Sequence, residues 1–261
     1  RLDLLKIDVE DMEEAVIVTG GSRRIGKRIS QTLESDGFFV IIHYNSSSRE
    51  ADSLASTIRD QGGQAETIEC DLSKVSDVET LIHRAETLFR VKVTGLVNNA
   101  SRYSYDDVNT IEVEEFSGHM IVNAYSPLIL SRELHKTGDG WVVNILDFKI
   151  KSPNSDFLSY TLSKFSLASI TDILARELAP KLRINAVAPG HTLTSDFLDD
   201  DKLESVNSAA PLGFGPSPED VANAVLYLAK AKSVTGQTIY VDGGERFRQQ
   251  IRDPAFNGDQ G

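Results

Sequence analysis

Residues 15–30 read AVIVTGGSRRIGKRIS: a short apolar run, a glycine-rich turn and the start of a helical pattern. Gly20 and Gly26 bracket the turn, and two consecutive arginines, Arg23 and Arg24, lie inside it. The first N–H groups of a helix lack backbone partners and carry a partial positive charge, so this order of strand, turn and helix forms a phosphate site. The stretch predicts a parallel strand–helix unit that holds the pyrophosphate of a dinucleotide.

Apolar runs of the same kind recur along the chain and alternate with longer helical patterns. Their hydrophobicity is nearly continuous, which is typical of parallel strands covered by helices on both faces. The seven expected strands are residues 15–19, 38–44, 65–70, 93–100, 141–146, 182–188 and 237–243. We therefore predict the α/β class: a single doubly wound Rossmann-type domain with a seven-stranded parallel sheet flanked by helices. Ser217 and Asp220 resemble a capping box and predict a helix at about 218–230.

The length of 261 residues suits one large domain better than two small ones. Residues 1–13 are interpreted as an N-terminal extension, with Met12 a candidate native start, and residues 14–245 as the domain itself. Within the domain, residues 192–216 are acidic and then rich in glycine and proline, which predicts a mobile flap. Residues 246–261 form a tail that either crosses to a neighbouring subunit or frays.

Composition argues against several classes of function. The net charge of −12 disfavours nucleic acid and anionic membranes as partners, and no apolar run reaches the roughly 20 residues that span a bilayer. We expect neither partner. The single cysteine, Cys70, has no second cysteine to pair with, which fits a cytoplasmic protein. The five histidines and this cysteine show no metal-ligand spacing, so no metal is predicted.

The end of the second expected strand bears on which dinucleotide is bound. NAD-binding sheets place an acid about 20 residues after the glycine turn, where it holds the ribose 2′-hydroxyl. Here residues 43–50 read HYNSSSRE, and donors replace the acid: His43, Asn45 and Ser46. The guanidinium groups of Arg23 and Arg24 suit a 2′-phosphate. The pattern favours NADP(H); the alternative is that both arginines are solvated loop charges.

Tyr160 and Lys164 lie four residues apart on a long expected helix, and hence on one face. A lysine ammonium beside a phenol stabilises the phenolate and brings the tyrosine pKa down from about 10 toward the range of a proton-transfer catalyst. This spacing alone recurs by chance on many helices. Further motifs accompany it: NNA at 98–100, Asn123, NAVAPG at 185–190 and VDGG at 241–244.

With these motifs the chain resembles the classical short-chain dehydrogenases/reductases over roughly residues 14–245, with Arg24 at the family's middle glycine. The resemblance implies that Tyr160 is the proton donor or acceptor, that Lys164 holds the nicotinamide ribose and tunes the tyrosine, and that Asn123 supports a water-linked proton relay. It also puts Asp71 near the adenine and the backbone of 189–192 near the nicotinamide amide. The cofactor-binding residues implied are Gly20, Arg23, Arg24, Ile25, Gly26, His43, Asn45, Ser46, Asp71, Leu72, Asn98, Ala100, Tyr160, Lys164, Pro189, Gly190 and Thr192.

One residue departs from the family pattern. The family normally has a serine about 13 residues before the tyrosine, whose hydroxyl hydrogen-bonds the substrate carbonyl; this chain has Asp147. An ionised carboxylate only accepts hydrogen bonds, so it repels an oxygen that gains negative charge and favours a substrate with N–H donors or a protonated C=N bond. It also raises the pKa of Tyr160, which suits the tyrosine as an acid. The predicted catalytic residues of this reduction are Asp147, Tyr160, Lys164 and Asn123.

An arginine in the glycine turn, Asp147, and NNASRY at 98–103 together resemble the pteridine reductase branch of the family, which includes the bacterial dihydropterin reductases. The resemblance implies that Tyr103 stacks on the pterin and that Ser101 hydrogen-bonds its pyrimidine side. The implied substrate residues are Arg24, Ser101, Tyr103, Asp147 and Tyr160. The NSSS stretch at 45–48 lacks the basic residue that some members carry. The family resemblance also implies a homotetramer, with the helices near 107–137 and 155–179 between subunits.

The leading hypothesis is an NADPH-dependent reductase of pterins or related heterocycles, in which hydride transfer is accompanied by a proton from Tyr160. One alternative is a carbonyl or cyclic imine reductase of the same family. Another is a non-catalytic NADPH-binding sensor, although a sensor needs only the glycine turn. His191, directly after Pro189 and Gly190, either touches substrate or is a bystander. The acidic run 199–201 is interpreted as a solvated face of the flap.

Overall fold

Seven strands form one fully parallel sheet in the order β3-β2-β1-β4-β5-β6-β7. A computed structural model describes residues 12–256; residues 1–11 of the expected N-terminal extension and residues 257–261 of the tail lie outside it. The strands are β1 Glu13–Val18, β2 Phe39–Tyr44, β3 Ala65–Glu69, β4 Val91–Asn98, β5 Gly140–Ile145, β6 Leu182–Pro189 and β7 Thr238–Val241. The predicted fold class and strand number are confirmed.

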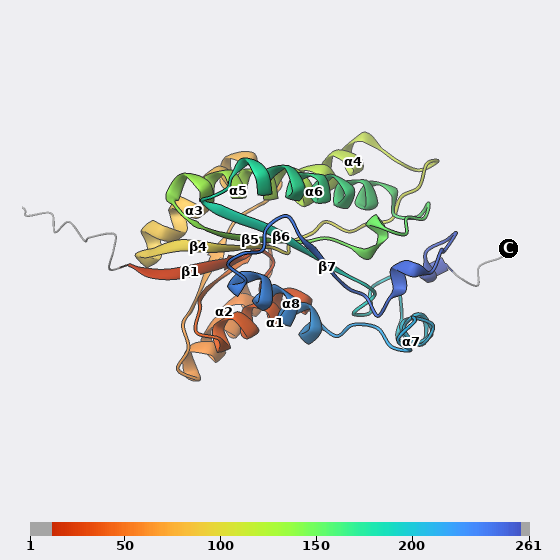
Figure 1. Cartoon of the computed structure of the whole chain (residues 1–261), viewed down its shortest axis with the longest axis horizontal. Coiled ribbons are helices and arrows are strands. Elements are labelled where there is room, and N and C mark those ends of the chain that lie inside the picture. The colour runs from red at the N-terminus through yellow and green to blue at the C-terminus, as the bar shows by residue number, and fades with distance from the viewer. Residues whose placement is uncertain (1–11, 257–261) are drawn as a thin grey trace, which may run out of the picture.

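Helices cover both faces of the sheet (Figure 1). One layer holds α1 Arg24–Ser35, α2 Ser48–Asp60 and α8 Pro218–Lys230. The other holds α3 Val75–Phe89, α4 Val113–Met120, α5 Ser126–Thr137 and α6 Leu158–Glu177, with a π-helical turn, Ile121–Tyr125, between α4 and α5. Among residues 12–256, no helix has both the length and the apolar character that crossing a membrane requires.

Side chains of β1 show why the apolar runs are continuous. Val16 and Val18 point to one face and join the cluster that contains residues of α1, α2 and α8. Ala15 and Ile17 point to the other face and join the cluster that contains residues of α3 and α5. Every one of these four side chains is at most 1% exposed. Both faces of the strand are therefore buried from Ala15 to Val18, so no polar residue interrupts this run.

Strand ends lie within two residues of the expected ones. The fourth strand was expected to end at residue 100 but ends at Asn98. The next two backbone N–H groups, of Asn99 and Ala100, both donate to the Thr19 hydroxyl, at 2.9 and 3.0 Å, instead of continuing the sheet. A side chain from the neighbouring loop thus ends the strand, which an apolar pattern does not reveal.

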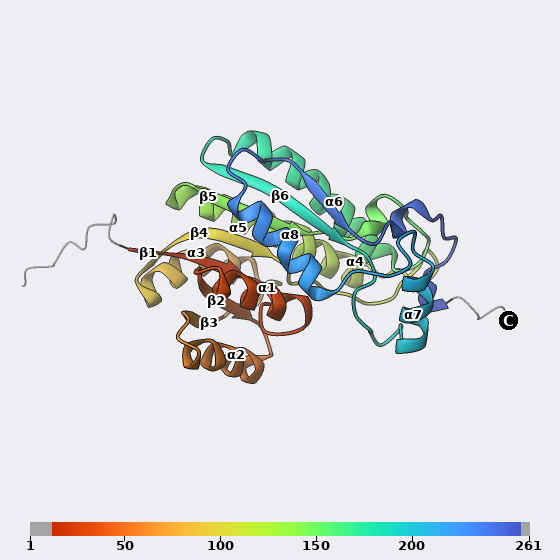
Figure 2. The ribbon, with the colours of Figure 1, turned by 60° about the horizontal axis from the view of Figure 1, so that its bottom comes forward.

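The predicted helix 218–230 is found with the predicted boundaries, and its capping box is formed by Ser217 and Asp220. The flap, residues 192–216, contains an unexpected helix, α7 Asp200–Ser208, whose first turn is capped by the Asp199 carboxylate at 2.8 Å from the Lys202 amide. The acidic run is exposed, as predicted, and also starts this helix. Figure 2 shows α7 beyond the carboxyl ends of the strands.

Residues 246–256 of the tail, here called the C-terminal segment, pack against their own chain. The Asp253 amide donates to the Asp156 carboxylate at 2.7 Å, and Arg252 pairs with the same carboxylate at 2.8 Å. Lys202 of α7 donates to the Ala255 carbonyl at 2.7 Å. Up to Phe256, the segment is therefore held by Asp156 and by α7 of its own chain.

Two leucine truncations on helices test the location of the core. Leu33 of α1 is fully buried, whereas Leu88 of α3 is 63% exposed. We expect Leu33→Ala to lower the free energy of unfolding by about 2–5 kcal/mol, because it leaves a cavity, and Leu88→Ala to change it by less than about 0.5 kcal/mol. Chemical denaturation measures both. Equal losses in the two variants would contradict this core.

Candidate active site

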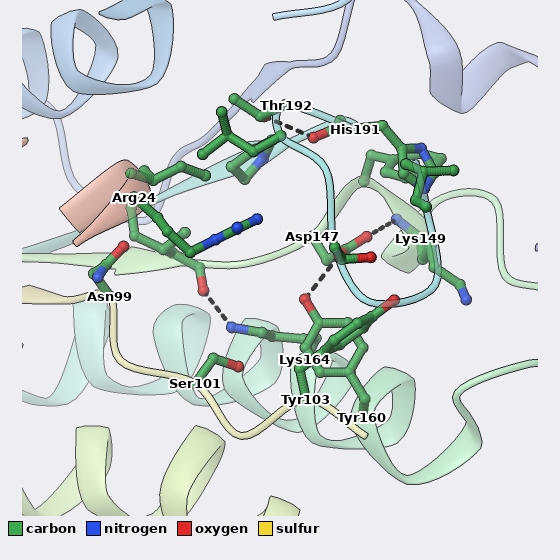
Figure 3. Close-up of a pocket in the computed structure, with 18 of the residues that line it drawn as sticks. Arg24, Asn99, Ser101, Tyr103, Asp147, Lys149, Tyr160, Lys164, His191 and Thr192 are labelled. Carbon is green, nitrogen blue, oxygen red and sulfur yellow. Dashed lines mark hydrogen bonds between the residues drawn. The ribbon is translucent and has the colours of Figure 1, made fainter. Parts of the chain in front are cut away.

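A cavity of about 740 Å³ opens at the carboxyl ends of β1, β4, β5 and β6. It lies where the strand order reverses between β1 and β4, which is the usual ligand site of open α/β sheets. Its size suits a cofactor together with a small substrate. The flap and the C-terminal segment supply the outer wall, through Leu198 and Ala255 among others. Figure 3 shows the side chains that border it.

Two glycines of the turn after β1 have no room for a side chain. Gly20 has a φ of +60°, and a Cβ there would lie 3.1 Å from the Ala100 Cα. A Cβ on Gly26 would overlap the Gly20 carbonyl oxygen. Helix α1 starts here without a side-chain cap, so its first N–H groups remain available beside the cavity. The turn has the shape and the donors to receive a pyrophosphate.

Arg24 adopts a backbone conformation that usually belongs to glycine. Its φ is +53°, which costs a residue with a side chain roughly 1–2 kcal/mol. The side chain crosses to the flap, where Nη2 donates to the Thr194 carbonyl at 2.6 Å. Arg24 therefore keeps the shape of the glycine turn and adds a cation that lines the cavity.

His43 does not offer a donor to a ligand, contrary to the prediction. Its Nδ1 accepts a hydrogen bond from the Gly20 amide at 3.1 Å, so Nε2 carries the proton and donates to the Cys70 carbonyl at 2.9 Å. Burial lowers the pKa of His43 from 6.5 to about 4, although the hydrogen bond to Cys70 opposes the shift. The neutral ring holds the glycine turn from behind.

Other residues predicted for the adenine end lie outside the cavity wall. Asn45 and Ser46 are exposed on the loop after β2. The Asp71 carboxylate accepts hydrogen bonds from the amide and hydroxyl of Ser73, at 3.0 and 2.7 Å, and Leu72 is buried.

Asn99, not the predicted Asn98, lines the cavity. Asn98 is 3% exposed, and its Nδ2 donates to Asn144 at 2.8 Å inside the sheet. Asn99 Nδ2 donates to the carbonyls of Thr19 and Gly20, at 2.9 and 3.2 Å, and so joins the end of β4 to the glycine turn. Neighbouring side chains along a strand point to opposite faces, so the NNA motif alone does not show which asparagine faces the cavity.

Three of the four predicted catalytic side chains, Asp147, Tyr160 and Lys164, meet at the cavity (Figure 3). The Tyr160 hydroxyl donates to Asp147 Oδ2 at 2.8 Å, and Asp147 Oδ1 accepts from the Lys149 amide at 2.8 Å. Lys164 Nζ donates to the Ile145 carbonyl at 2.8 Å and lies 5.6 Å from the centre of the Tyr160 ring. Asp147 follows β5, while Tyr160 and Lys164 come from α6.

Burial and charge shift all three pKa values. Burial raises the pKa of Asp147, although the Lys149 amide and nearby cations oppose the shift. Burial, and then the charge and hydrogen bond of Asp147, raise the pKa of Tyr160 well above 10, the direction predicted from the sequence. Burial lowers the pKa of Lys164 to about 8, with Asp147 opposing. Tyr160 is consequently a protonated phenol at neutral pH and can act as an acid.

Asn123 lies behind the cavity wall, in the π-helical turn, and is 1% exposed. Its side chain exchanges hydrogen bonds with the backbone of Arg102, at 2.7 and 2.9 Å, and donates to Ser163 at 2.9 Å. Both of its amide hydrogens are used within the chain. The side chain thus fastens the loop after β4 to α6, the helix that carries Tyr160.

Tyr103 presents an aromatic ring at the cavity and is 44% exposed. It stacks on Phe157 with centroids 4.7 Å apart and meets the edge of Tyr160 at 4.8 Å. Phe197 of the flap and Phe256 of the C-terminal segment extend this cluster through Phe157. Ser101 also lines the cavity.

Sequence reasoning missed two charged pairs beside the cavity. Lys149 and Asp253 form a buried ion pair of 3.1 Å, and Lys149 also donates to the Asp156 carbonyl at 3.0 Å. His191 Nδ1 lies 2.6 Å from the carboxylate of buried Glu245. In both pairs the partners are more than 50 residues apart. Of these residues, Lys149 could have been suspected from the sequence, because it follows Asp147 by two residues.

Fourteen of the predicted site residues line this cavity. They are Gly20, Arg23, Arg24, Ile25, Gly26, Ala100, Ser101, Tyr103, Asp147, Tyr160, Lys164, Pro189, Gly190 and Thr192. Seven others do not: His43, Asn45, Ser46, Asp71, Leu72, Asn98 and Asn123. The residues that meet come from the ends of four adjacent strands, from the start of α1 and from α6.

The adh_short_C2 family model, described as enoyl-(acyl carrier protein) reductase, matches residues 20–245. An uncharacterized oxidoreductase of Methylorubrum extorquens is 30% identical over 243 residues, which cover 89% of this chain and 98% of that protein. The chain belongs to the short-chain dehydrogenase/reductase family. A 3-oxoacyl-[acyl-carrier-protein] reductase, FabG, of Staphylococcus epidermidis is 28% identical, with 89% of this chain and 99% of that protein covered.

Among solved structures, FolM alternative dihydrofolate reductase 1 from Brucella suis, in complex with NADP, superposes with a TM-score of 0.86. It is 39% identical, and the match covers 90% of this chain and 96% of that one. This protein is thus an oxidoreductase of the short-chain dehydrogenase/reductase family, with its tyrosine and lysine beside a carboxylate instead of the usual serine.

The His43 bonds predict a specific pH dependence of stability in this short-chain dehydrogenase/reductase. The unfolded chain binds a proton near pH 6.5 and the folded one near pH 4, so stability falls as pH drops through this window. The shift corresponds to about 3 kcal/mol. We expect His43→Gln to lack this part of the acid destabilisation, measured as unfolding free energy at pH 7 and pH 4. Exposed His83→Gln is the control, and identical pH profiles for wild type and His43→Gln would contradict the tautomer described.

Proposed function

We propose that this enzyme is an NADPH-dependent reductase of pterins, of the type that converts a dihydropterin to a tetrahydropterin. The observation that carries the proposal is the Tyr160–Asp147 hydrogen bond inside the cavity, where the family has a serine. A buried carboxylate there accepts hydrogen bonds and repels a developing oxyanion, which favours a C=N substrate over a ketone.

Three features support NADPH as the cofactor. The glycine turn and the uncapped start of α1 suit a pyrophosphate. Arg23 and Arg24 border the cavity and suit a further phosphate, and no carboxylate follows β2 before Glu50. The FolM protein of Brucella suis was solved in complex with NADP. Because His43 is bonded within the chain, the arginines are the cations that we propose for the 2′-phosphate.

Two features support a pterin as the substrate. Tyr103 offers a partly exposed ring against which a flat heterocycle can stack. Asp147 can accept hydrogen bonds from the N–H groups that a reduced pterin carries. The Brucella suis protein at 39% identity is described as an alternative dihydrofolate reductase, an activity on a pterin-containing molecule.

NADPH supplies the hydride when it is bound. The chain supplies the proton: the raised pKa keeps the Tyr160 hydroxyl protonated, so it can donate to the substrate nitrogen as the C=N bond is reduced. Asp147, with its own pKa raised, can hold the proton that restores Tyr160. Lys164 beside the ring stabilises the tyrosine oxygen while the proton leaves. Carbon gains hydride, nitrogen gains a proton, and the site is reprotonated from water.

The proposed assembly is the homotetramer implied by the family resemblance. An apolar groove runs between α4, α5 and α6, lined by Phe116, Met120, Ile121, Tyr125, Leu128 and Ile170 among others. Tyr125 is 44% exposed and Ile173 of α6 is 63% exposed. Large apolar side chains on adjacent helices support contact between subunits through this face.

Turnover with a dihydropterin tests the proposal directly. We expect the wild-type enzyme to oxidise NADPH rapidly with 7,8-dihydrobiopterin, and much more slowly with NADH or with a simple ketone. Tyr160→Phe removes the proton donor and should lower kcat on the order of 10²- to 10⁴-fold while leaving NADPH affinity unchanged. Loss of NADPH absorbance measures kcat, and cofactor fluorescence measures binding.

Exposed Tyr227→Phe on α8 is the matched control and should keep full activity. Turnover of ketones in preference to the pterin would replace the proposal with a carbonyl reductase. Turnover of other cyclic imines alone would replace it with an imine reductase. NADPH binding with no turnover of any of these would indicate a cofactor-binding sensor.

Exchange of Asp147 for the family's serine tests the substrate argument. Asp147→Ser should reduce kcat/KM for the dihydropterin on the order of 10- to 100-fold and raise it for a cyclic ketone, because a hydroxyl donor suits an oxyanion. Asp139→Ser, at an exposed position, serves as the control. An unchanged ratio of pterin to ketone turnover would contradict the role given to Asp147.

Replacement of Arg24 by glycine separates its backbone from its charge. Arg24→Gly should relieve the left-handed strain, keep or raise the free energy of unfolding, and weaken NADPH and pterin binding about 10-fold. Arg90, at the end of α3, has a φ of +55° and does not line the cavity, so Arg90→Gly is the matched control. Unchanged binding of both ligands in Arg24→Gly would exclude a ligand contact by Arg24.

A further inference from the structure

His191 is held at the cavity wall by a buried carboxylate. Its Nδ1 lies 2.6 Å from Glu245 Oε1, and its backbone amide donates to Glu245 Oε2 at 3.1 Å. The Glu245 side chain is 2% exposed and the His191 side chain 16% exposed. Two bonds from one residue to both carboxylate oxygens fix the position of the ring.

The Glu245 carboxylate, 2.6 Å from Nδ1, favours the protonated form of the imidazole. Burial disfavours the charge, but the hydrogen bond and charge of Glu245, with the charges of Asp253 and Asp147, outweigh it and raise the pKa of His191. The pair therefore holds a cation next to the cavity. A buried ion pair seldom stabilises a fold more than apolar side chains of the same size, so its position beside the site calls for a functional explanation.

The donor of His191 that faces away from Glu245 is the second ring nitrogen, Nε2. Among the described residues, the hydrogen bonds of the ring involve Nδ1 only. The ring packs against Phe148, with centroids 5.3 Å apart. His191 lines the cavity after β6, the strand next to β5, which Asp147 follows (Figure 3). Nε2–H is thus available to a ligand there.

Three other cations of the cavity wall have donors occupied within the chain. Lys149 is bonded to Asp253 and to the Asp156 carbonyl, and Lys164 to the Ile145 carbonyl. Arg24 reaches the Thr194 carbonyl. His191 differs from Lys164 and Arg24 in that a buried carboxylate fixes its ring through Nδ1, which leaves Nε2 for a ligand. The wall next to Asp147 thereby combines a hydrogen-bond acceptor with a charged donor.

We propose that His191, positioned by Glu245, is a specificity-determining residue that donates from Nε2 to an oxygen acceptor of the substrate. This inference rests on the proposed pterin reduction and deepens it. The substrate then presents an N–H edge to Asp147 and an oxygen to His191. The oxygen belongs either to the ring carbonyl of the pterin or to its side chain, and both supply the same acceptor chemistry.

Three ligands distinguish the two sources of oxygen. Biopterin has both a ring carbonyl and side-chain hydroxyls, 6-methylpterin has only the ring carbonyl, and 2,4-diamino-6-methylpteridine has neither. Titration calorimetry in the presence of NADP⁺ gives their dissociation constants for the wild type, His191→Leu, His191→Gln and the exposed control His83→Leu. Affinity for NADP⁺, measured alone, reports whether each variant is folded.

His191→Leu should weaken the oxygen-bearing ligand on the order of 10- to 100-fold and the diamino ligand less than about threefold, because a charged hydrogen bond is lost only with the former. The loss of affinity in His191→Gln, which keeps a neutral donor, should be smaller than the loss in His191→Leu. Losses for biopterin and 6-methylpterin together indicate the ring carbonyl, and a loss for biopterin alone indicates the side chain. With 7,8-dihydrobiopterin as substrate, KM should rise more than kcat falls.

Equal losses for all three ligands, or no loss for any, would overturn the inference. In that case wild-type turnover of 7,8-dihydrobiopterin would still support the pterin reductase, so the two proposals fail separately. A wild-type enzyme that neither binds nor reduces pterins would overturn both. If His191→Leu does not bind NADP⁺, the result for His191→Gln decides, and ligand ratios equal to those of the wild type would reject the charged donor.

Discussion

A parallel sheet covered on both faces can present polar groups to a ligand only where its strands end, and the rest of this structure depends on that constraint. The strand order reverses between β1 and β4, so the loops that follow these strands part and leave a crevice. The glycine turn, Asn99, Asp147 and His191 each follow a different strand and meet there. Because burial keeps the strands apolar, the polar residues of the site lie together at one edge of the sheet, where the strands end.

The chemistry of the site follows from the presence of Asp147 in the buried cavity, at the position where the family has a serine. A carboxylate in a buried cavity is unfavourable unless it is paired or protonated, and Asp147 has a hydroxyl and an amide as partners. The same burial raises the pKa of both Asp147 and Tyr160 and lowers that of Lys164. In the proposed reaction these three groups supply the proton that reduction of a C=N bond requires.

The glycine turn illustrates how a side chain can be added without loss of shape. Arg24 occupies a left-handed conformation at the position where the family has glycine, and its guanidinium then reaches the flap. The cost in backbone strain is of the order of one hydrogen bond. In exchange, the turn gains a charge at the cavity and a direct link between the glycine turn and the flap, which are 170 residues apart.

The sequence by itself determined the sheet, the glycine turn and the pair of Tyr160 and Lys164, because periodicity, glycine spacing and an i, i+4 pair are local. Asp147 was found only through the resemblance to the family, in which a serine precedes the tyrosine. The sequence did not reveal that His43 supports the turn or that Asn99, rather than Asn98, faces the cavity, since each depends on which partner lies nearby. The His191–Glu245 and Lys149–Asp253 pairs likewise join distant segments. Only the tertiary structure decided these, because hydrogen bonds and charges act through space and a linear pattern does not record which groups share a buried environment.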